Sequence, residues 1–313
     1  NNIDVIVIDH HQSEVLLPKA FSIINPNRYD DTSEMNYLCA AGVCFMFLIS
    51  LNKKLREDNW FRNKNISEPN LLKFLDLVSL GTICDVVPLK NLNRAFVKQG
   101  LKILTQKKNL GLKTLINICE IDSALSTYHL GYVLGPRINA GGRVGKSSHG
   151  ANLLLNYNPK ETFKIAQELN HFNMERRELE KSLVDDIEDK VKNVINDPVI
   201  ILSGKNWHEG IIGIVASRIK EKYNKPTIII SLNKNIGKAS ARSISGFDIG
   251  SLIISCLQNK IIEKGGGHKM AGGFTININK LNDFKEFVFK RFQKIDINKI
   301  SKNIIYIDSE IAP

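Results

Sequence analysis

Four consecutive apolar residues, Val5 to Ile8, are followed directly by Asp9, His10 and His11. Such a short run of β-branched residues is typical of a strand that is buried on both faces, as in a parallel sheet. Because ligands of open α/β sheets bind at the carboxyl ends of the strands, the three polar side chains are expected at the mouth of a site. Imidazole and carboxylate groups are suitable ligands for Mn²⁺ and similar ions. Taken alone, the pattern fits a metal site and a surface turn equally well.

The composition describes a globular protein with room for two domains. The chain has 313 residues, and its apolar fraction of 43% is typical of proteins with a substantial core. A net charge of +11 favours a polyanionic partner such as nucleic acid, although a general lysine bias would produce the same number. The five cysteines form no Cys-x-x-Cys pair and are expected to be reduced, buried thiols. No apolar run of the sequence is long enough to span a bilayer.

A further acidic residue, Asp85, lies in an otherwise apolar segment. The preceding residues 70–80 have apolar side chains at helical spacing, with Asn70 as the expected N-cap and Gly81 as the expected end. An unpaired buried carboxylate is costly, so Asp85 should have a partner. Either a metal ion shared with His10 or a hydrogen bond in a structural site would supply that partner.

Two glycine-rich segments carry polar side chains that suit phosphate. Residues 134–145 combine four glycines with Arg137 and Arg143, which predicts a tight loop with exposed amides and fork-shaped donors. Residues 265–267 are three glycines followed by His268, so that the backbone can approach a ligand that the histidine also reaches. The alternative for both segments is an ordinary turn with solvated side chains.

The remaining pattern divides the chain into two α/β parts. A long helical pattern with a strongly charged middle runs from Pro159 to Asn196 and is expected to connect two domains. Spacing and breakers predict helices at 36–51, 91–105, 111–119, 211–223, 248–262 and 283–294, strands at 23–24, 199–202, 227–231 and 274–278, and an exposed loop at 51–65.

Five motifs, taken in order, resemble the DHH phosphoesterase superfamily, and within it the bacterial exonucleases that are specific for single-stranded DNA. They are Asp-His-His at 9–11, Leu-Gly-Thr-Ile-Cys-Asp-Val-Val-Pro-Leu at 80–89, Gly-Pro-Arg-Ile-Asn-Ala-Gly-Gly-Arg at 135–143, Asn-Trp-His-Glu-Gly at 206–210 and Gly-Gly-Gly-His at 265–268. The resemblance implies an α/β fold class, in which an N-terminally truncated, parallel-sheet DHH catalytic domain is joined by a long helix to a smaller α/β domain of the DHHA1 type. The implied bounds are 1–157 for the catalytic part, 158–196 for the connecting helix, 197–298 for the DHHA1-type domain and 299–313 for the start of a truncated following segment.

The activity that this resemblance implies is metal-dependent hydrolysis of single-stranded DNA, from the 5′ end to mononucleotides, in DNA repair and recombination. By matching position, His10 and Asp85 correspond to ligands of a two-ion Mn²⁺ or Mg²⁺ site whose other ligands would precede residue 1. Asp9 would orient His10, and His11 would face the scissile phosphate, so these two are the catalytic candidates. The positions that match phosphate- and strand-binding residues are Arg137, Asn139, Arg143, His208, Ser240, Arg242, Gly265, Gly266, Gly267 and His268.

The resemblance also implies single-stranded DNA as the partner, with a single-strand-binding protein and a helicase as candidate protein partners. It further implies that the protein is a monomer and that it is located in the cytoplasm, away from membranes. Because the chain opens on a core strand without an initiator Met, we expect a fragment with little activity of its own. Two rival functions stay open, namely an oligoribonuclease or nucleotide phosphatase of the same superfamily and a non-catalytic single-strand-binding relative. The Asp-Val-Val-Pro-Leu and Gly-Pro-Arg-Ile-Asn segments argue against the first, and the retained His10, His11 and Asp85 argue against the second.

Overall fold

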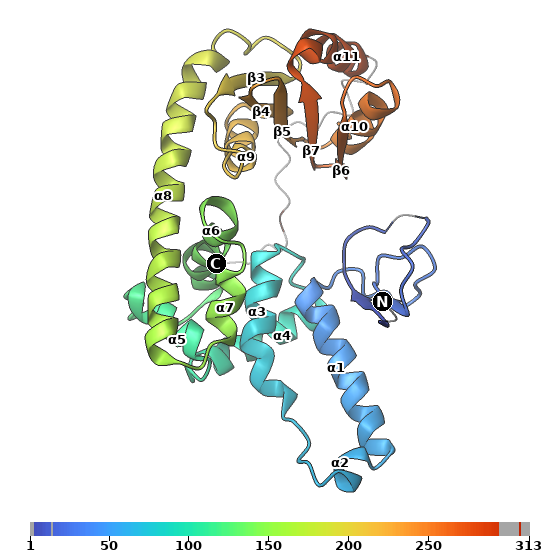
Figure 1. Ribbon diagram of the computed structural model, residues 1–313, viewed down its shortest axis with the longest axis vertical. Helices are drawn as coiled ribbons and strands as arrows, with labels where there is room; N and C mark the ends of the chain where they lie inside the picture. Colours follow the sequence, from blue (N-terminus) through green and yellow to red (C-terminus); the bar gives the residue numbers. More distant parts are fainter. Residues whose placement is uncertain (1–2, 14, 294–306, 308–313) are drawn as a thin grey trace. The chain divides into compact units, whose positions relative to one another are not determined.

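The computed structural model describes residues 3–13, 15–293 and 307, and the chain divides into two units (Figure 1). The first unit comprises residues 1–173 and the second unit residues 174–313. No helix among the described residues is both long and apolar enough to cross a membrane. The segment 299–313, expected to begin a further part of the protein, lies outside the described residues except for residue 307.

The first unit begins with two short parallel strands, β1 (Ile6–Ile8) and β2 (Ser22–Ile24), which pair from Ile6 with Ser22 to Ile8 with Ile24. The prediction that the first strand is buried on both faces is wrong, since Val5 and Ile6 are each about half exposed. Among the described residues β1 pairs only with β2, so one of its edges has no neighbouring strand. Ile8 and Ile24 nevertheless pack against a buried cluster that includes Phe45.

Helices form the rest of the first unit and bury two apolar clusters between them. They are α1 (Ala40–Glu57), α2 (Trp60–Asn63), η1 (Leu71–Phe74), α3 (Leu75–Cys84), α4 (Asn91–Leu104), α5 (Leu110–Ile118), the π-helix η2 (His129–Leu134), α6 (Gly135–Val144), α7 (His149–Leu155) and the first part of α8 (Pro159–Val191). The helices predicted at 91–105, 111–119 and from 159 onward are confirmed. The loop predicted at 51–65 is wrong, because α1 continues to Glu57 and α2 follows.

Two predictions that read glycine as a helix breaker are wrong. Gly81 lies inside α3, where a Cβ would come within 2.8 Å of the Ala41 Cβ, so its small size allows α3 to pack on α1. The segment 134–145 is helical up to Val144 rather than a loop, because η2 runs directly into α6. A Cβ at Gly135 would lie 2.4 Å from the Cys84 Sγ. In both places close packing between helices outweighs the weak helical propensity of glycine.

The second unit is built on a five-stranded mixed sheet in the order β3-β4-β5-β7-β6 (Figure 1). Its strands are β3 (Ile200–Lys205), β4 (Thr227–Asn233), β5 (Ile236–Arg242), β6 (Lys264–His268) and β7 (Ala271–Asn277). Its helices after α8 are α9 (Ile212–Tyr223), α10 (Ile249–Gln258), the short η3 (Ile278–Lys280) and α11 (Leu281–Gln293). β3 and β4 are parallel and are connected by α9, as the strand–helix–strand pattern predicted. Together with the parallel pair of the first unit, this arrangement confirms the predicted α/β fold class.

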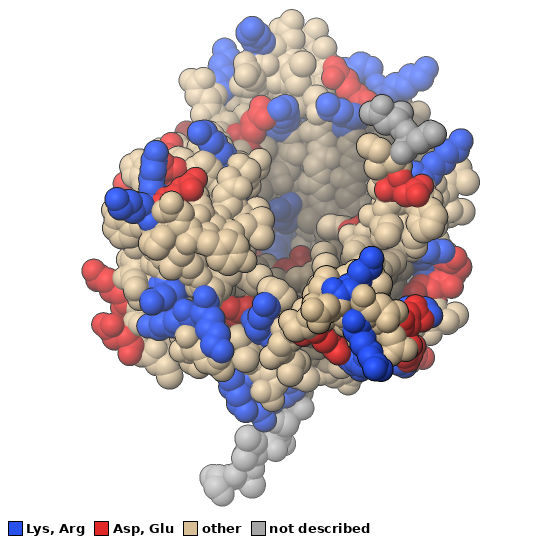
Figure 2. All heavy atoms as spheres, turned by 60° about the horizontal axis from the view of Figure 1, so that its bottom comes forward, with Lys and Arg blue, Asp and Glu red and all other residues tan. Residues whose placement is uncertain are grey.

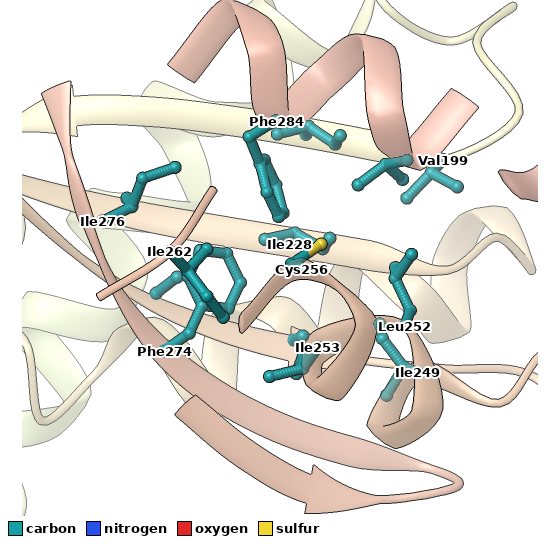
Figure 3. Close-up of a cluster of buried hydrophobic side chains, with 14 of the residues drawn as sticks. Val199, Ile228, Ile249, Leu252, Ile253, Cys256, Ile262, Phe274, Ile276 and Phe284 are labelled. Atoms are coloured by element: carbon teal, nitrogen blue, oxygen red, sulfur yellow. The ribbon is translucent and has the colours of Figure 1, made fainter. Parts of the chain in front are cut away.

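The core of the second unit lies between the sheet and helices α10 and α11. Figure 3 shows Ile228 and Phe274 of the sheet together with Ile253 of α10 and Phe284 of α11 in one buried cluster. The glycine run before His268, expected to form a turn, is instead strand β6 in a hairpin with β7. Glycine is required there for a packing reason, since a Cβ at Gly267 would lie 2.4 Å from the Ala271 carbonyl oxygen.

Candidate active site

The loop after β1 brings His10 to the C-terminal end of α3, where Asp85 is the capping residue. His10 Nε2 lies 3.4 Å from Asp85 Oδ2, although the two residues are far apart in the sequence. The His10 side chain is 15% exposed and the Asp85 side chain 40%. The carboxylate therefore lies at the surface and not in an apolar interior, which corrects the expected burial. The structure does bring together the two predicted metal ligands.

Asp9 faces His11 rather than His10. His11 Nδ1 lies 2.8 Å from Asp9 Oδ1, and the backbone N–H of His11 donates to the same oxygen over 3.3 Å. Partial burial raises the pKa of the Asp9 carboxyl, but the hydrogen bonds from the His11 ring and the two backbone amides outweigh it, so the pKa is lowered overall. In the part of the chain that the structure describes, no hydrogen bond joins the Asp9 carboxylate to the His10 ring. The orienting role expected for Asp9 therefore has no contact to support it.

Two asparagines that the sequence analysis did not single out hold the backbone of the two histidines. Asn27 Nδ2 donates to the His10 carbonyl over 2.7 Å, and Asn25 Nδ2 donates to the His11 carbonyl over 2.9 Å. Asn25 Oδ1 in turn accepts the backbone N–H of Asn27. Both asparagines follow β2 directly, so polar residues after the second strand were the available signal. The loop that carries the histidines is thereby fixed before any ligand binds.

His10 and Asp85 fit as two ligands of one divalent ion. The carboxylate oxygen suits both Mn²⁺ and Mg²⁺, whereas the imidazole nitrogen suits Mn²⁺ better than Mg²⁺, which prefers oxygen ligands. Their separation of 3.4 Å is compatible with two adjacent metal–ligand bonds of about 2.0–2.2 Å. The described residues contain no group of three or more His, Cys, Asp or Glu placed to hold an ion. The pair therefore accounts for only part of a two-ion site.

The predicted phosphate-binding residues of the first unit lie on α6, whose first residue, Gly135, lies close to Cys84 of α3. Arg137 donates from Nε to Asn170 Oδ1 and from Nη1 to the Val133 carbonyl, each over 2.8 Å, so its guanidinium is oriented by α8 and η2. Asn139 is exposed and Arg143 is half-buried. These three residues thus share one helix instead of the loop that was expected.

In the second unit, Arg242 ends β5 and lies against α9. Its Nε donates to Ser217 Oγ over 3.1 Å, and its Nη1 donates to Ser240 Oγ over 3.1 Å and to the Ala241 carbonyl over 2.9 Å. A Cβ at Gly213 would lie 3.1 Å from Arg242 Nη2 and 3.0 Å from Ser240 Oγ. Ser240 and Arg242 were predicted site residues, whereas Ser217 and Gly213 were missed because they act through contacts across the fold.

His208 and His268 share one local arrangement. The backbone N–H of Gly210 donates to His208 Nδ1 over 3.1 Å, and the backbone N–H of Met270 donates to His268 Nδ1 over 3.3 Å. Because Nδ1 accepts in both rings, the neutral tautomer of each carries its proton on Nε2. Both side chains are exposed, so each can present an N–H donor to a phosphate oxygen.

The loop around His208 is anchored on three sides. Trp207 Nε1 donates to Asp186 Oδ2 of α8 over 2.8 Å, and Ser231 Oγ of β4 donates to the Trp207 carbonyl over 2.5 Å. Glu209 pairs with Lys238 of β5 over 2.6 Å. His208 consequently extends from a fixed loop.

The basic side chains do not gather in one patch on the face shown in Figure 2. There, lysine and arginine side chains are interleaved with aspartate and glutamate side chains. On this face the excess positive charge is therefore spread out rather than gathered in a broad basic surface.

Comparison with known proteins agrees with the motif pattern. Residues 196–294 match the model of the DHHA1 domain family. The chain is 34% identical to the single-stranded-DNA-specific exonuclease RecJ of Dickeya dadantii, over 99% of this chain and 56% of the relative. It is 36% identical to RecJ of Escherichia coli, over 91% of this chain and 51% of the relative. The chain thus spans about half the length of the curated relatives it matches.

Solved structures show the same relationship. The crystal structure of RecJ from Thermus thermophilus in complex with Mn²⁺ matches with a TM-score of 0.80 and 28% identity, over 95% of this chain and 42% of that chain. A structure of exonuclease RecJ bound to manganese matches with a TM-score of 0.77 and 27% identity, over 96% of this chain and 72% of that one. By sequence and by fold, the chain is similar to RecJ exonucleases over nearly its whole length, and its residues 196–294 match the DHHA1 domain family.

Proposed function

We propose that the protein is a metal-dependent exonuclease that hydrolyses the phosphodiester bonds of single-stranded DNA from the 5′ end and releases mononucleotides, in DNA repair and recombination. The observation that carries the proposal is the approach of His10 Nε2 to Asp85 Oδ2 within 3.4 Å. The relatives named as single-stranded-DNA-specific exonucleases support the substrate class, and the related structures with Mn²⁺ and Mg²⁺ support the type of ion.

In this function His10 and Asp85 would hold a Mn²⁺ or Mg²⁺ ion of a two-ion site. Two such ions, when bound, supply an activated water and stabilise the entering and leaving oxygens of a phosphodiester. Asn25 and Asn27 keep the histidine backbone in place. Because Asp9 occupies His11 Nδ1, the ring nitrogen that His11 can offer to the scissile phosphate is Nε2.

Strand binding is assigned to the predicted phosphate donors, of which Arg137 and Arg242 are held in place by hydrogen bonds. Arg242 with Ser240, His208, and the segment from Gly265 to His268 would contact phosphates from the second unit. Arg137, Asn139 and Arg143 would do so from the first unit. Since these contacts displace counterions from the strand, binding should weaken steeply as the salt concentration rises.

The cellular setting and the domain bounds are part of the same proposal. We take single-stranded DNA as the partner, with a single-strand-binding protein and a helicase supplying it, and the protein as a cytoplasmic monomer. The five cysteines are free thiols, which is consistent with a reducing compartment. We also keep 1–157, 158–196 and 197–298 as the proposed catalytic part, connecting helix and DHHA1-type domain.

The test uses the intact protein and compares a long 5′-phosphorylated single strand with a dinucleotide as substrates, in Mn²⁺. We expect hydrolysis of the long strand, with loss of activity in His10→Ala and full activity in the control His171→Ala, which removes an exposed histidine of α8. Strand binding by His10→Ala should stay close to that of the wild type. Preference for the dinucleotide, or unchanged hydrolysis by His10→Ala, would refute the proposal.

A further inference from the structure

Two tyrosines form an exposed aromatic pair at the π-helix η2: Tyr132 lies within it, and Tyr128 is its N-cap residue. The rings of Tyr128 and Tyr132 are stacked, with centroids 5.3 Å apart and an interplanar angle of 26°. Their side chains are 61% and 69% exposed. Neither the metal ligands nor the phosphate donors described above include these residues. Adjacent apolar side chains that are exposed to solvent often mark a site of interaction with another molecule.

The pair stands on a rigid base. Leu130 and Leu134, which alternate with the tyrosines along the helix, are completely buried in the core of the first unit. His129 packs edge-on against Tyr128 at 5.7 Å and is itself held by hydrogen bonds with Ser126. The rings are therefore presented in a fixed orientation, which lowers the entropic cost of binding a ligand.

The helix that carries the pair also lies against the element that presents Asp85. Cys84 Sγ donates to the Leu130 carbonyl over 3.6 Å, and a Cβ at Gly131 would lie 3.2 Å from Ile83 Cγ2. Cys84 is the last residue of α3 and immediately precedes Asp85. On its other side η2 continues without interruption into α6, which carries Arg137. The tyrosines thus occur on a helical segment between a candidate metal ligand and candidate phosphate donors.

We propose that Tyr128 and Tyr132 form a stacking platform for a nucleobase of a bound single strand. Single-strand-binding proteins pair cationic groups for the backbone with aromatic rings for the bases, and such stacking tolerates any sequence because every base has a π-face. A π-helix turn is frequently found at functional sites, and here it sets the two rings side by side. The inference rests on the proposed function and assigns to this platform the contact with bases rather than with phosphates.

The experiment measures equilibrium binding of two 5′-phosphorylated strands of equal length, one with bases and one made entirely of abasic units, in EDTA to prevent hydrolysis. The variant is Tyr128→Leu/Tyr132→Leu, and its folding is checked by circular dichroism. The control is Tyr157→Leu, because Tyr157 is 90% exposed and lies outside η2 and its cap. A second variant, Tyr128→Phe/Tyr132→Phe, keeps both rings.

The double leucine variant should lose about 5- to 100-fold in affinity for the strand with bases and little for the abasic strand. The phenylalanine variant and Tyr157→Leu should bind both strands as the wild type does. The stacking platform would be refuted if the leucine variant lost equal affinity for both strands, lost affinity for neither, or changed its oligomeric state. If the wild type binds neither strand, the proposed function fails together with the inference, whereas wild-type binding that does not depend on the tyrosines refutes the inference alone.

Discussion

Arg242 Nε donates to Ser217 Oγ over 3.1 Å, so a serine of α9 fixes the guanidinium at the end of β5. Ser240 Oγ receives a second hydrogen bond from the same guanidinium. Since a side chain with this many rotatable bonds loses entropy when it binds a phosphate, holding it in place beforehand should favour binding.

Ser217→Ala should therefore weaken binding of a 5′-phosphorylated single strand by roughly 2- to 12-fold, as expected when one intramolecular hydrogen bond with a net value of about 0.5–1.5 kcal/mol is lost. The measurement is a binding titration at fixed salt concentration. Ser217→Thr keeps the hydroxyl and should bind as the wild type does. Equal binding by Ser217→Ala and the wild type would show that Ser217 does not position Arg242 for the strand.

Gly213→Ala should weaken strand binding without lowering stability. The added Cβ would come within 3.1 Å of Arg242 Nη2 and 3.0 Å of Ser240 Oγ, so the guanidinium must shift. Gly213 lies in the first turn of α9, where alanine gains less than the roughly 1 kcal/mol of a helix interior, so the free energy of unfolding should change little. The matched control is Gly142→Ala, where a Cβ would meet no atom within 4 Å. A titration in which Gly213→Ala binds normally would contradict this account.

Glu168→Ala should destabilise the first unit. Glu168 Oε2 lies 2.7 Å from Nε2 of His149, whose side chain is buried and whose Nδ1 has no hydrogen-bond partner among the described residues. Removal of Glu168 would leave both ring nitrogens unpaired, at a cost of roughly 1–3 kcal/mol in the free energy of unfolding. Denaturant unfolding measures the change, with Gln167→Ala, at an exposed position of α8, as the control. A difference below the error of that measurement would show that the pair contributes nothing.

Asp186→Asn should lower stability at neutral pH and have a smaller effect in acid. Hydrogen bonds from Lys190 and then Trp207 hold the pKa of the Asp186 carboxyl below its ordinary value of 3.8. A carboxyl whose pKa is lowered in the folded state stabilises the protein above its ordinary pKa, and this contribution is lost as the pH falls through the lowered value. The denaturant concentrations at which the wild type and Asp186→Asn are half unfolded should thus converge below about pH 4. A constant difference from pH 7 to pH 3 would rule out the charge as the cause.

Several elements could be predicted because their signals are local. Regular apolar spacing located α4, α5 and α8, and β-branched runs bounded by Asn and Pro located β3 and β4. The order of the motifs was sufficient to indicate a DHH relative, and the cost of an unpaired carboxylate pointed to a partner for Asp85. These inferences need only neighbouring residues or the general chemistry of a side chain.

What the sequence by itself determined is therefore the position of the regularly spaced helices and of the buried strands of the second unit, together with the chemical types of the candidate site residues. Only the tertiary structure decided that Gly81 and Gly135 lie inside or at the start of helices, that Gly267 lies in a strand, and that β1 is half exposed. It also decided which side chains hold the site in place, such as Ser217 for Arg242. The physical reason is that a glycine signals both a turn and a close approach, and a hydroxyl signals both solvation and a hydrogen bond. The choice depends on which atoms from distant parts of the chain lie within a few ångströms.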